Sequence, residues 1–317
     1  MKVLVTGGAG FIGSHLAEAL CRRDIRVVVL DNLSFGSLRN LDWRRGDDEL
    51  EFIKGDIRDE KLLAKVVPGC DWVFHQSAVS SVPYSVAMPL ESNAHNLEGT
   101  LNLLVAARDA GVKRFLYASS AAVYGDDDPA LKHEGLPPNP LSPYALQKYG
   151  SEKYAQLFHR LYGLETVALR YFNIFGPRQS FTSPYSGVIA KFCTGMLQRE
   201  APVIFGDGRQ SRDFTFISDV VAANLLAAEA PSERVAGKVF NIATGQSITL
   251  LQLVAELNRL TGQQLKPRFE PPRPGDVRSS QSDISATRRD LGYEAKITWE
   301  QGLAATLEYY RKNPSIQ

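Results

Sequence analysis

Short apolar segments alternate with amphipathic segments along the first half of the chain. The apolar segments predict strands at Lys2–Thr6, Arg26–Leu30, Glu51–Gly55, Asp71–His75 and Arg114–Ser119. The amphipathic segments between them predict helices that include Phe11–Arg23, Glu60–Val67 and Pro89–Ala110. Because strands that alternate with helices pair in parallel through right-handed crossovers, this pattern predicts a doubly wound α/β fold with a parallel sheet.

The pattern changes in the second half of the chain. A long helix is predicted from about Leu141 to Tyr162, and a strand follows at Glu165–Tyr171. Beyond Phe175, clusters of glycine, proline and arginine interrupt the chain, and helices are predicted at Ser218–Glu229, Thr249–Leu260 and Trp299–Tyr310. We therefore expect a core of residues 1–175 and a smaller C-terminal α/β region of residues 176–317, with some chain crossing back to the core.

Composition and charge exclude several classes of protein. The 317 residues carry 36 basic and 35 acidic side chains, so no broad field would hold nucleic acid or an anionic membrane. The three cysteines, Cys21, Cys70 and Cys193, have no metal-binding spacing and are expected to be reduced thiols. The sequence has no signal-peptide pattern and no apolar run long enough to span a bilayer. We expect a cytoplasmic protein without a metal site.

A glycine-rich turn follows the first predicted strand. Gly7, Gly10 and Gly13 lie in the segment TGGAGFIG, between this strand and the first helix. Glycine lets the backbone approach a pyrophosphate closely, and the helix N-terminus presents free N–H groups to it. Asp31 ends the second strand, where a carboxylate can accept hydrogen bonds from adenosine ribose hydroxyls and repel a 2′-phosphate. Asp31 and Asn32 could instead form only a turn, but beside the glycine segment they favour NAD binding.

Tyr144 and Lys148 have the spacing that places two side chains on one face of a helix. A nearby ammonium group would lower the pKa of Tyr144 and make this residue a general base and acid. The same spacing also arises by chance in exposed helices. Ser119 and Ser120, however, end a preceding strand at the sheet edge where ligands bind, and a serine hydroxyl there can hold a substrate oxygen. We therefore interpret Ser120, Tyr144 and Lys148 as a catalytic group.

These motifs together resemble the extended short-chain dehydrogenase/reductases, and within them the UDP-glucose/UDP-N-acetylglucosamine 4-epimerases. The resemblance runs from residue 2 to about residue 310 and includes the segment RYFN, residues 170–173. It implies a Rossmann-type core with tightly held NAD and a C-terminal region that binds mainly the nucleotide sugar. It also implies that Tyr144 removes the proton of the sugar C4 hydroxyl while a hydride passes from C4 to NAD. Ser120 would hold the C4 oxygen, and Lys148 would bind the nicotinamide ribose.

The resemblance also assigns positions to two ligand sites. The positions for NAD are Gly7, Gly10, Phe11, Ile12, Gly13, Asp31, Asn32, Asp56, Ile57, Gln76, Ser77, Ala78, Asn96, Ser119, Tyr144, Lys148 and Tyr171. The positions for the UDP-sugar are Ser80, Ser81, Ser120, Tyr144, Asn173, Arg212, Arg273, Asp276 and Ser280. Arginine suits a diphosphate because its planar guanidinium group offers a fork of donors, although a single surface arginine is more often only solvated.

The two residues that follow Ser120 bear on the reaction. In the sugar 4,6-dehydratases that share this framework, the corresponding positions are typically Asp and Glu, which supply the acid and base for eliminating water. Here they are Ala121 and Ala122, and alanine can carry no proton. The pair therefore favours epimerisation at C4 over dehydration.

Ser280 bears on the choice of sugar. Epimerases restricted to glucose and galactose tend to carry a bulky tyrosine at this position, whereas serine would leave space for a 2-N-acetyl group. The segment Ser80–Pro83 also resembles that of epimerases that prefer N-acetylated sugars. We therefore expect UDP-GlcNAc and UDP-GalNAc as substrates, with UDP-glucose and UDP-galactose as the other pair. The alternative is that Ser280 is only a loop residue.

Partners and rival functions complete the sequence-based expectations. The resemblance implies a homodimer built on the helices near Leu97–Ala110 and Leu141–Tyr162, although the aromatic residues of the second helix are by themselves more typical of a core. Another enzyme of this class, such as a UDP-glucuronate 4-epimerase or decarboxylase, is an alternative. A non-catalytic NAD-binding protein is another, but the presence of both Tyr144 and Lys148 argues against it.

Overall fold

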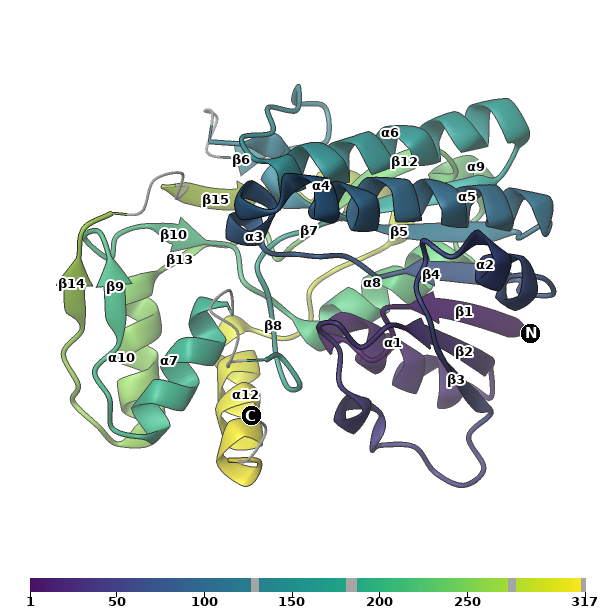
Figure 1. Cartoon of the computed structure of the whole chain (residues 1–317). Helices are drawn as coiled ribbons and strands as arrows, with labels where there is room; N and C mark the ends of the chain where they lie inside the picture. Colours follow the sequence, from purple (N-terminus) through teal and green to yellow (C-terminus); the bar gives the residue numbers. More distant parts are fainter. Residues whose placement is uncertain (127–130, 181–186, 273–277, 315–317) are drawn as a thin grey trace.

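A seven-stranded parallel sheet forms the centre of the computed structural model (Figure 1). The structure describes residues 1–126, 131–180, 187–272 and 278–314. Neighbouring strands of this large sheet are, in order, β3 (Leu50–Lys54), β2 (Arg26–Asp31), β1 (Lys2–Thr6), β4 (Trp72–His75), β5 (Arg114–Ser120), β7 (Glu165–Tyr171) and β12 (Lys238–Ile242). The strand order reverses direction at β1, so the sheet is doubly wound and of the Rossmann type, as the alternating pattern predicts.

Helices cover both faces of the large sheet (Figure 1). Buried side chains of α1 (Phe11–Cys21) and α8 (Ile217–Glu229) form one cluster with the sheet. Those of α2 (Glu60–Val66), α5 (Gly99–Asp109) and α6 (Pro143–Tyr162) form a second cluster on the opposite face. Because both faces are buried, the strands are continuous apolar segments and do not alternate between apolar and polar residues.

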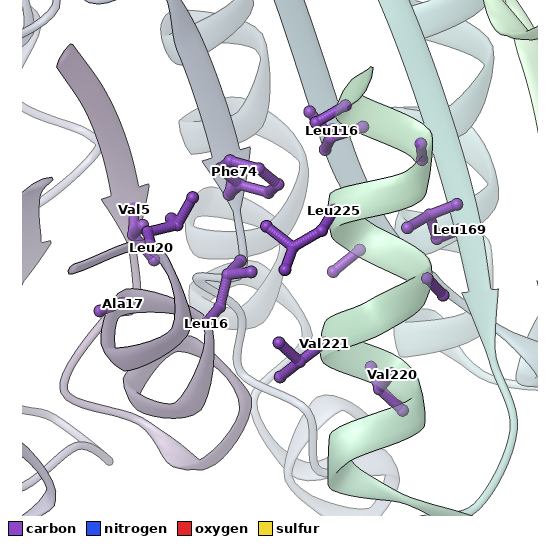
Figure 2. Close-up of a cluster of buried hydrophobic side chains, with 14 of the residues drawn as sticks. Val5, Leu16, Ala17, Leu20, Phe74, Leu116, Leu169, Val220, Val221 and Leu225 are labelled. Carbon is purple, nitrogen blue, oxygen red and sulfur yellow. The ribbon is translucent and has the colours of Figure 1, made fainter. Parts of the chain in front are cut away.

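The cluster that α1 and α8 form with the sheet contains more buried residues than any other cluster in the described chain (Figure 2). The sheet contributes Val5, Phe74, Leu116 and Leu169, and the two helices contribute Leu16, Leu20, Val221 and Leu225. Next to these strand residues, Leu4, Val73 and Phe115 belong to the cluster on the other face, since successive side chains of a strand point in opposite directions. Each such buried side chain contributes roughly 1.5–3 kcal/mol.

A smaller region is built mostly from the second half of the chain. One four-stranded sheet has the order β13 (Ile248–Thr249), β10 (Ser211–Arg212), β15 (Ser279–Ser282) and β6 (Leu131–Lys132). Two strand pairs are β8 (Ile174–Phe175) with β11 (Thr215–Phe216), and β9 (Val203–Phe205) with β14 (Arg268–Glu270). A third cluster of buried side chains joins the helices α7 (Val188–Leu197), α10 (Leu250–Thr261) and α12 (Trp299–Lys312). Further short elements include α3 (Val82–Ala87), α9 (Ser232–Val235), α11 (Ser285–Leu291), η1 (Leu38–Leu41) and η3 (Ala121–Tyr124).

The two halves of the chain are interleaved in space. Strand β12 and helix α8 come from residues 176–317 but belong to the large sheet and its covering layer. Conversely, β6 comes from the first half but pairs with β15 in the small sheet. Each half of the chain therefore contributes strands to both the large sheet and the small sheet.

One predicted helix is divided in the structure. The prediction of a single helix over Pro89–Ala110 is corrected to α4 (Pro89–Asn93), a π-helical turn η2 (Ala94–Glu98) and α5. Two local contacts accompany the wider turn: the Asn96 side chain bonds the backbone of Val79, and Gly99 lies where a Cβ atom would be 2.7 Å from Ile57. Such π turns often occur beside functional sites. Other predicted ends differ by a residue or two.

Candidate active site

A cavity of about 1380 Å³ opens at the carboxyl ends of the central strands. Loops that follow β1, β2, β4, β5 and β7 all contribute to its wall. Of the predicted NAD positions, those that line it are Gly7, Gly10, Phe11, Ile12, Gly13, Asp31, Asn32, Asp56, Ile57, Gln76, Ser77, Ala78, Ser119, Tyr144, Lys148 and Tyr171. Of the predicted sugar positions, those that line it are Ser80, Ser81, Ser120, Tyr144, Asn173, Arg212 and Ser280.

The glycine turn packs backbone against backbone at one end of this cavity. Gly7 has a φ of +67°, and a Cβ atom on it would lie 2.7 Å from the amide nitrogen of Ser77. A Cβ atom on Gly13 would lie 2.2 Å from the carbonyl oxygen of Gly7. Gly10 is the N-cap residue of α1, so no capping side chain stands between the helix N-terminus and the cavity. This geometry fits the pyrophosphate of NAD.

Asp31 occupies the position expected for a ribose-binding carboxylate. Its two oxygens accept hydrogen bonds from the backbone N–H groups of Ala9 (3.0 Å) and Leu33 (2.8 Å), which fix the carboxylate at the cavity wall. Burial raises the pKa of Asp31, and these two bonds oppose the effect. Beside it, the Asn32 amide donates to Asp56 at 2.8 Å, so two predicted NAD positions also contact each other.

Helix α6 carries the predicted acid–base pair into the cavity. Ser142 caps the helix by accepting the N–H group of Ala145 at 3.2 Å, and Pro143 occupies its first turn. Tyr144 and Lys148 are both buried and both line the cavity. The Lys148 Nζ atom donates to the Ala118 carbonyl at 2.7 Å and lies 5.9 Å from the centre of the Tyr144 ring.

The electrostatics of this pair correct one sequence-based expectation. Burial raises the pKa of Tyr144, and the hydrogen bond with the Ser120 hydroxyl acts in the opposite direction. Burial also lowers the pKa of Lys148 to about 7. The sequence predicts that the ammonium group of Lys148 lowers the pKa of Tyr144, whereas burial of Tyr144 raises it. Ser120 is instead the group that favours the phenolate.

Asn96, a predicted NAD contact, is not among the residues that line the cavity, and its contact with NAD stays a prediction. Its side chain is buried behind the loop that follows β4. It accepts the N–H group of Val79 at 2.8 Å and donates to the Val79 carbonyl at 3.0 Å and to Gln147 at 2.8 Å. Asn96 therefore fixes the loop that carries predicted ligand positions, including Ser77 and Ser80.

The predicted sugar positions lie on several elements. Pairing of β10 with β15 places Arg212 beside Ser280 at the cavity wall. Asn173 follows β7, and its amide donates to the Asp213 carbonyl at 3.3 Å. Ser81 caps α3 by accepting the N–H group of Tyr84 at 3.0 Å. Arg273 and Asp276, which are also predicted sugar positions, lie outside the described residues.

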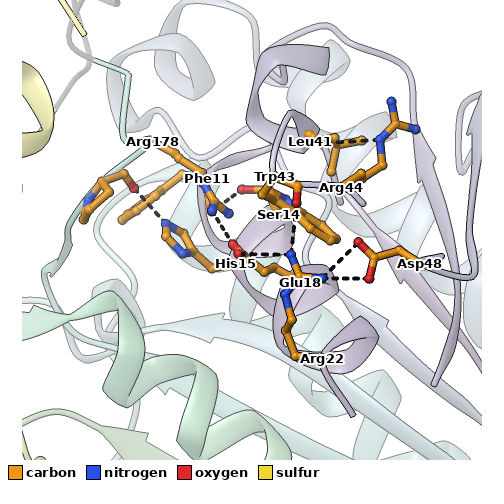
Figure 3. Close-up of polar contacts among 11 residues, drawn as sticks. Phe11, Ser14, His15, Glu18, Arg22, Leu41, Trp43, Arg44, Asp48 and Arg178 are labelled. Carbon is orange, nitrogen blue, oxygen red and sulfur yellow. Dashed lines mark hydrogen bonds and ion pairs between the residues drawn. The ribbon is translucent and has the colours of Figure 1, made fainter. Parts of the chain in front are cut away.

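Several cavity residues were missed by the sequence analysis, and Arg178 is the most informative. Its guanidinium group pairs with Glu18 on the outer face of α1 (Figure 3). The neighbouring His15 ring bonds the Pro177 carbonyl at 2.9 Å, and Arg22 pairs with Asp48 at 2.7 Å. The Gly-Pro-Arg cluster at residues 176–178 marks a loop in the sequence. No sequence pattern near residues 176–178 predicts their contact with α1, because the two segments are far apart along the chain. Other missed cavity residues are Phe35, Trp43, Tyr309 and Asn313.

The described ranges contain no candidate metal site and no candidate membrane span. Within them, no group of three or more His, Cys, Asp or Glu side chains could hold a metal ion. The helices found there include none that is both long and apolar enough to cross a membrane. All three cysteines are buried free thiols.

Comparison with known proteins agrees with this site. Residues 3–243 match the model of the NAD dependent epimerase/dehydratase family, and the chain belongs to this family. The residues that line the cavity fit NAD, which the family binds: a glycine turn that a Cβ atom would fill, an open helix N-terminus and a carboxylate at the end of β2.

Solved structures resemble the chain over nearly its whole length. UDP-N-acetylglucosamine 4-epimerase from Methanobrevibacter ruminantium M1, in complex with UDP-N-acetylmuramic acid, is 40% identical with a TM-score of 0.93, covering 98% of both chains. UDP-glucose 4-epimerase from Thermotoga maritima, with UDP-glucose, is also 40% identical with a TM-score of 0.93, covering 99% of this chain and 100% of the other. A dTDP-glucose 4,6-dehydratase of Actinoplanes sp. is 37% identical, covering 99% of each sequence.

Replacing Gly13 by alanine is expected to weaken NAD binding at least tenfold, or about 1.4 kcal/mol. The new Cβ atom would meet the Gly7 carbonyl, a backbone atom that cannot move without opening the turn. NAD content of the purified protein and titration of the NAD-free protein measure the effect. Gly46→Ala is the matched control, because a Cβ atom there meets nothing within 4 Å. Equal NAD binding by both variants would contradict the assigned role of the turn.

Proposed function

We propose that this protein is a nucleotide-sugar 4-epimerase that interconverts the C4 epimers of a UDP-hexose. One observation carries the proposal: Ser120, Tyr144 and Lys148 line the same cavity as Ala121 and Ala122. An acid–base pair is therefore present where a sugar C4 hydroxyl could react, while the two positions that would serve dehydration carry only methyl groups. This separates the chain from its dehydratase relatives.

The protein residues would divide the work at the C4 oxygen. Tyr144 takes the proton of the C4 hydroxyl and later returns it, while Ser120, its hydrogen-bond partner, holds the oxygen. Lys148 uses one of its three donors on the Ala118 carbonyl, which leaves two for ribose hydroxyls. When bound, NAD supplies the acceptor and then the donor of the hydride at C4. Because Tyr144 and Lys148 are buried, bulk water is kept from the reacting atoms.

We further propose that the enzyme accepts N-acetylated sugars, UDP-GlcNAc and UDP-GalNAc, as well as or better than UDP-glucose and UDP-galactose. The support is Ser280, a small residue at the cavity wall in register with Arg212, which would bind the diphosphate. Ser80 and Ser81 line the same cavity with small polar side chains. Solved relatives named for each of the two sugars resemble the chain equally well.

A homodimer is proposed on the outer face of α6. Leu146, Leu157 and Leu161 recur at helical spacing and are 58%, 40% and 60% exposed, so they form an apolar stripe that the described chain leaves uncovered. Helices α4 and α5, joined end to end through η2, lie beside α6 in one outer layer (Figure 1), and a second copy could pack against this layer. We also propose a cytoplasmic location, which suits the free thiols.

Epimerisation is tested by incubating the purified protein with UDP-GlcNAc, UDP-glucose or UDP-glucuronate without added NAD and following the H4 and anomeric proton signals by NMR. We expect the C4 epimer of UDP-GlcNAc.

Tyr144→Phe is expected to lower kcat by about 10²- to 10⁴-fold, since the proton then has no carrier. Tyr162→Phe, at an exposed position on the same helix, is the control. A 4-keto-6-deoxy product, or full activity of Tyr144→Phe, would overturn the proposal.

Ser280→Tyr is expected to abolish turnover of UDP-GlcNAc and to preserve turnover of UDP-glucose. The phenol ring would fill the space that a 2-N-acetyl group needs at the cavity wall. The ratio of kcat/KM values for the two sugars measures the change. Unchanged turnover of UDP-GlcNAc by the variant would show that position 280 does not select the sugar.

Leu157→Glu is expected to convert the dimer into monomers, because it places a charge in the middle of the apolar stripe on α6. Sedimentation or light scattering at micromolar protein concentration reports the mass. Leu251→Glu, at a leucine that is 39% exposed on α10, is the matched control and should stay dimeric. A wild-type protein with the mass of a monomer would exclude the proposed dimer.

A further inference from the structure

Glu152 is a fully buried carboxylate in the third turn of α6, four residues beyond Lys148. One oxygen accepts the Ser119 hydroxyl at 2.9 Å and the Arg170 Nε–H group at 3.0 Å. The other oxygen accepts an Arg170 Nη2–H bond at 2.6 Å. Tyr144, Lys148 and Glu152 follow one another at intervals of four residues, so the three side chains lie along one stripe of the helix.

These bonds join α6 to two strands directly behind the catalytic groups. Lys148 holds the carbonyl of Ala118, and Glu152 holds the side chain of Ser119, the next residue of β5. Arg170 lies on β7, where it pairs in register with Ser119. Ser120, which lines the cavity together with Tyr144, is the residue that immediately follows the two anchored positions. The helix and the strand end are therefore fixed relative to each other at successive residues.

Arg170 also contacts the segment that follows Ser120. The guanidinium carbon of Arg170 lies 4.7 Å from the centre of the Tyr124 ring, and Tyr124 ends the short helix η3 that begins at Ala121. The Tyr124 hydroxyl in turn donates to Asn241 on β12 at 2.7 Å. Both sides of Ser120 are thus connected to the Glu152–Arg170 pair.

Stability alone is a poor explanation for this pair. Burying two charges costs desolvation energy that their attraction only partly returns, and apolar replacements of similar size are often as stable. The ion pair instead fixes the relative positions of α6, β5 and β7, because its hydrogen bonds are directional and join atoms of these three elements.

We infer that Glu152 is a positioning residue for the reaction: through Ser119 and Arg170 it fixes the strand end that carries Ser120 against the helix that carries Tyr144. The inference rests on the proposed epimerase function. Loss of the link would let the strand end shift against α6, and a shift of about 1 Å at reacting groups can cost up to about 10²-fold in rate. The glycine turn and Arg212, which we propose bind the NAD pyrophosphate and the UDP diphosphate, lie outside this link, so these contacts would remain.

The sharpest test is Ser119→Ala, which removes the link to β5 and leaves the buried ion pair intact. We expect kcat at saturating NAD to fall about tenfold, with KM for the UDP-sugar unchanged. Because Ser119 is also a predicted NAD position at the cavity wall, NAD content is measured in parallel. Thr166→Val is the matched control, since the Thr166 hydroxyl also donates to α6, at the Ala155 carbonyl (2.7 Å), but at the opposite end of the strand layer. It should keep kcat within about twofold of the wild type.

A second variant removes the charges together. Glu152→Met with Arg170→Met leaves no unpaired buried charge, and it should lower kcat at least as much as Ser119→Ala. Adding Ser119→Ala to this background should have no further effect, because the partner of the hydroxyl is gone. If the double variant does not fold, Ser119→Ala against Thr166→Val decides alone. Equal kcat values for those two variants, or full kcat in the folded double variant, would overturn the inference.

Measuring C4 epimerisation by the wild-type protein distinguishes failure of this inference from failure of the proposed function. Absence of C4 epimerisation by the wild-type protein would contradict the function itself. Normal epimerisation by the wild type, Ser119→Ala and Thr166→Val alike would contradict only the positioning role.

Discussion

Parallel pairing of β1, β4 and β5 is the constraint on which the site depends. The pairing puts Thr6 beside His75 and His75 beside Tyr117, so the three strands end at one edge of the sheet. The residues that follow them therefore meet: the glycine turn after β1, the loop of Gln76 after β4 and Ser120 at the end of β5. The backbone that we propose binds a pyrophosphate and the side chains that we propose are catalytic become neighbours although they are far apart along the chain.

Burial then sets the chemistry of the groups gathered at this edge. Desolvation lowers the pKa of Lys148 to about 7 and raises the pKa of Tyr144. To take a proton from a sugar hydroxyl, Tyr144 must be a phenolate, and the hydrogen bond with Ser120 favours that form. The hydrogen bond from Ser120 to Tyr144 and the anchoring of Lys148 to the Ala118 carbonyl keep the geometry in which this exchange can occur.

A second buried carboxylate joins the sugar side of the cavity to the core. Asp213 follows β10 and accepts the backbone N–H groups of Thr244 (2.8 Å), Gly245 (3.0 Å) and Ser282 (3.3 Å). Thr244 follows β12 of the large sheet, whereas Ser282 belongs to β15 of the small one. Burial raises the pKa of Asp213 to about 6, and these bonds act against the rise. Asp213 therefore ties the strand of Arg212 to both sheets, which is how the interleaved halves form one cavity.

The sequence by itself determined the doubly wound core. It also singled out the glycine turn and the group of Ser120, Tyr144 and Lys148 as candidates, because each rests on local periodicity, glycine spacing or the i, i+4 rule. These residues and Asp31 all line one cavity. Only the tertiary structure decided the π turn around Asn96, which holds Val79 from behind the cavity, and the contact of Arg178 with α1. It also decided the direction of the Tyr144 pKa shift. These features depend on burial and on contacts between distant segments, and no local pattern in the chain encodes them.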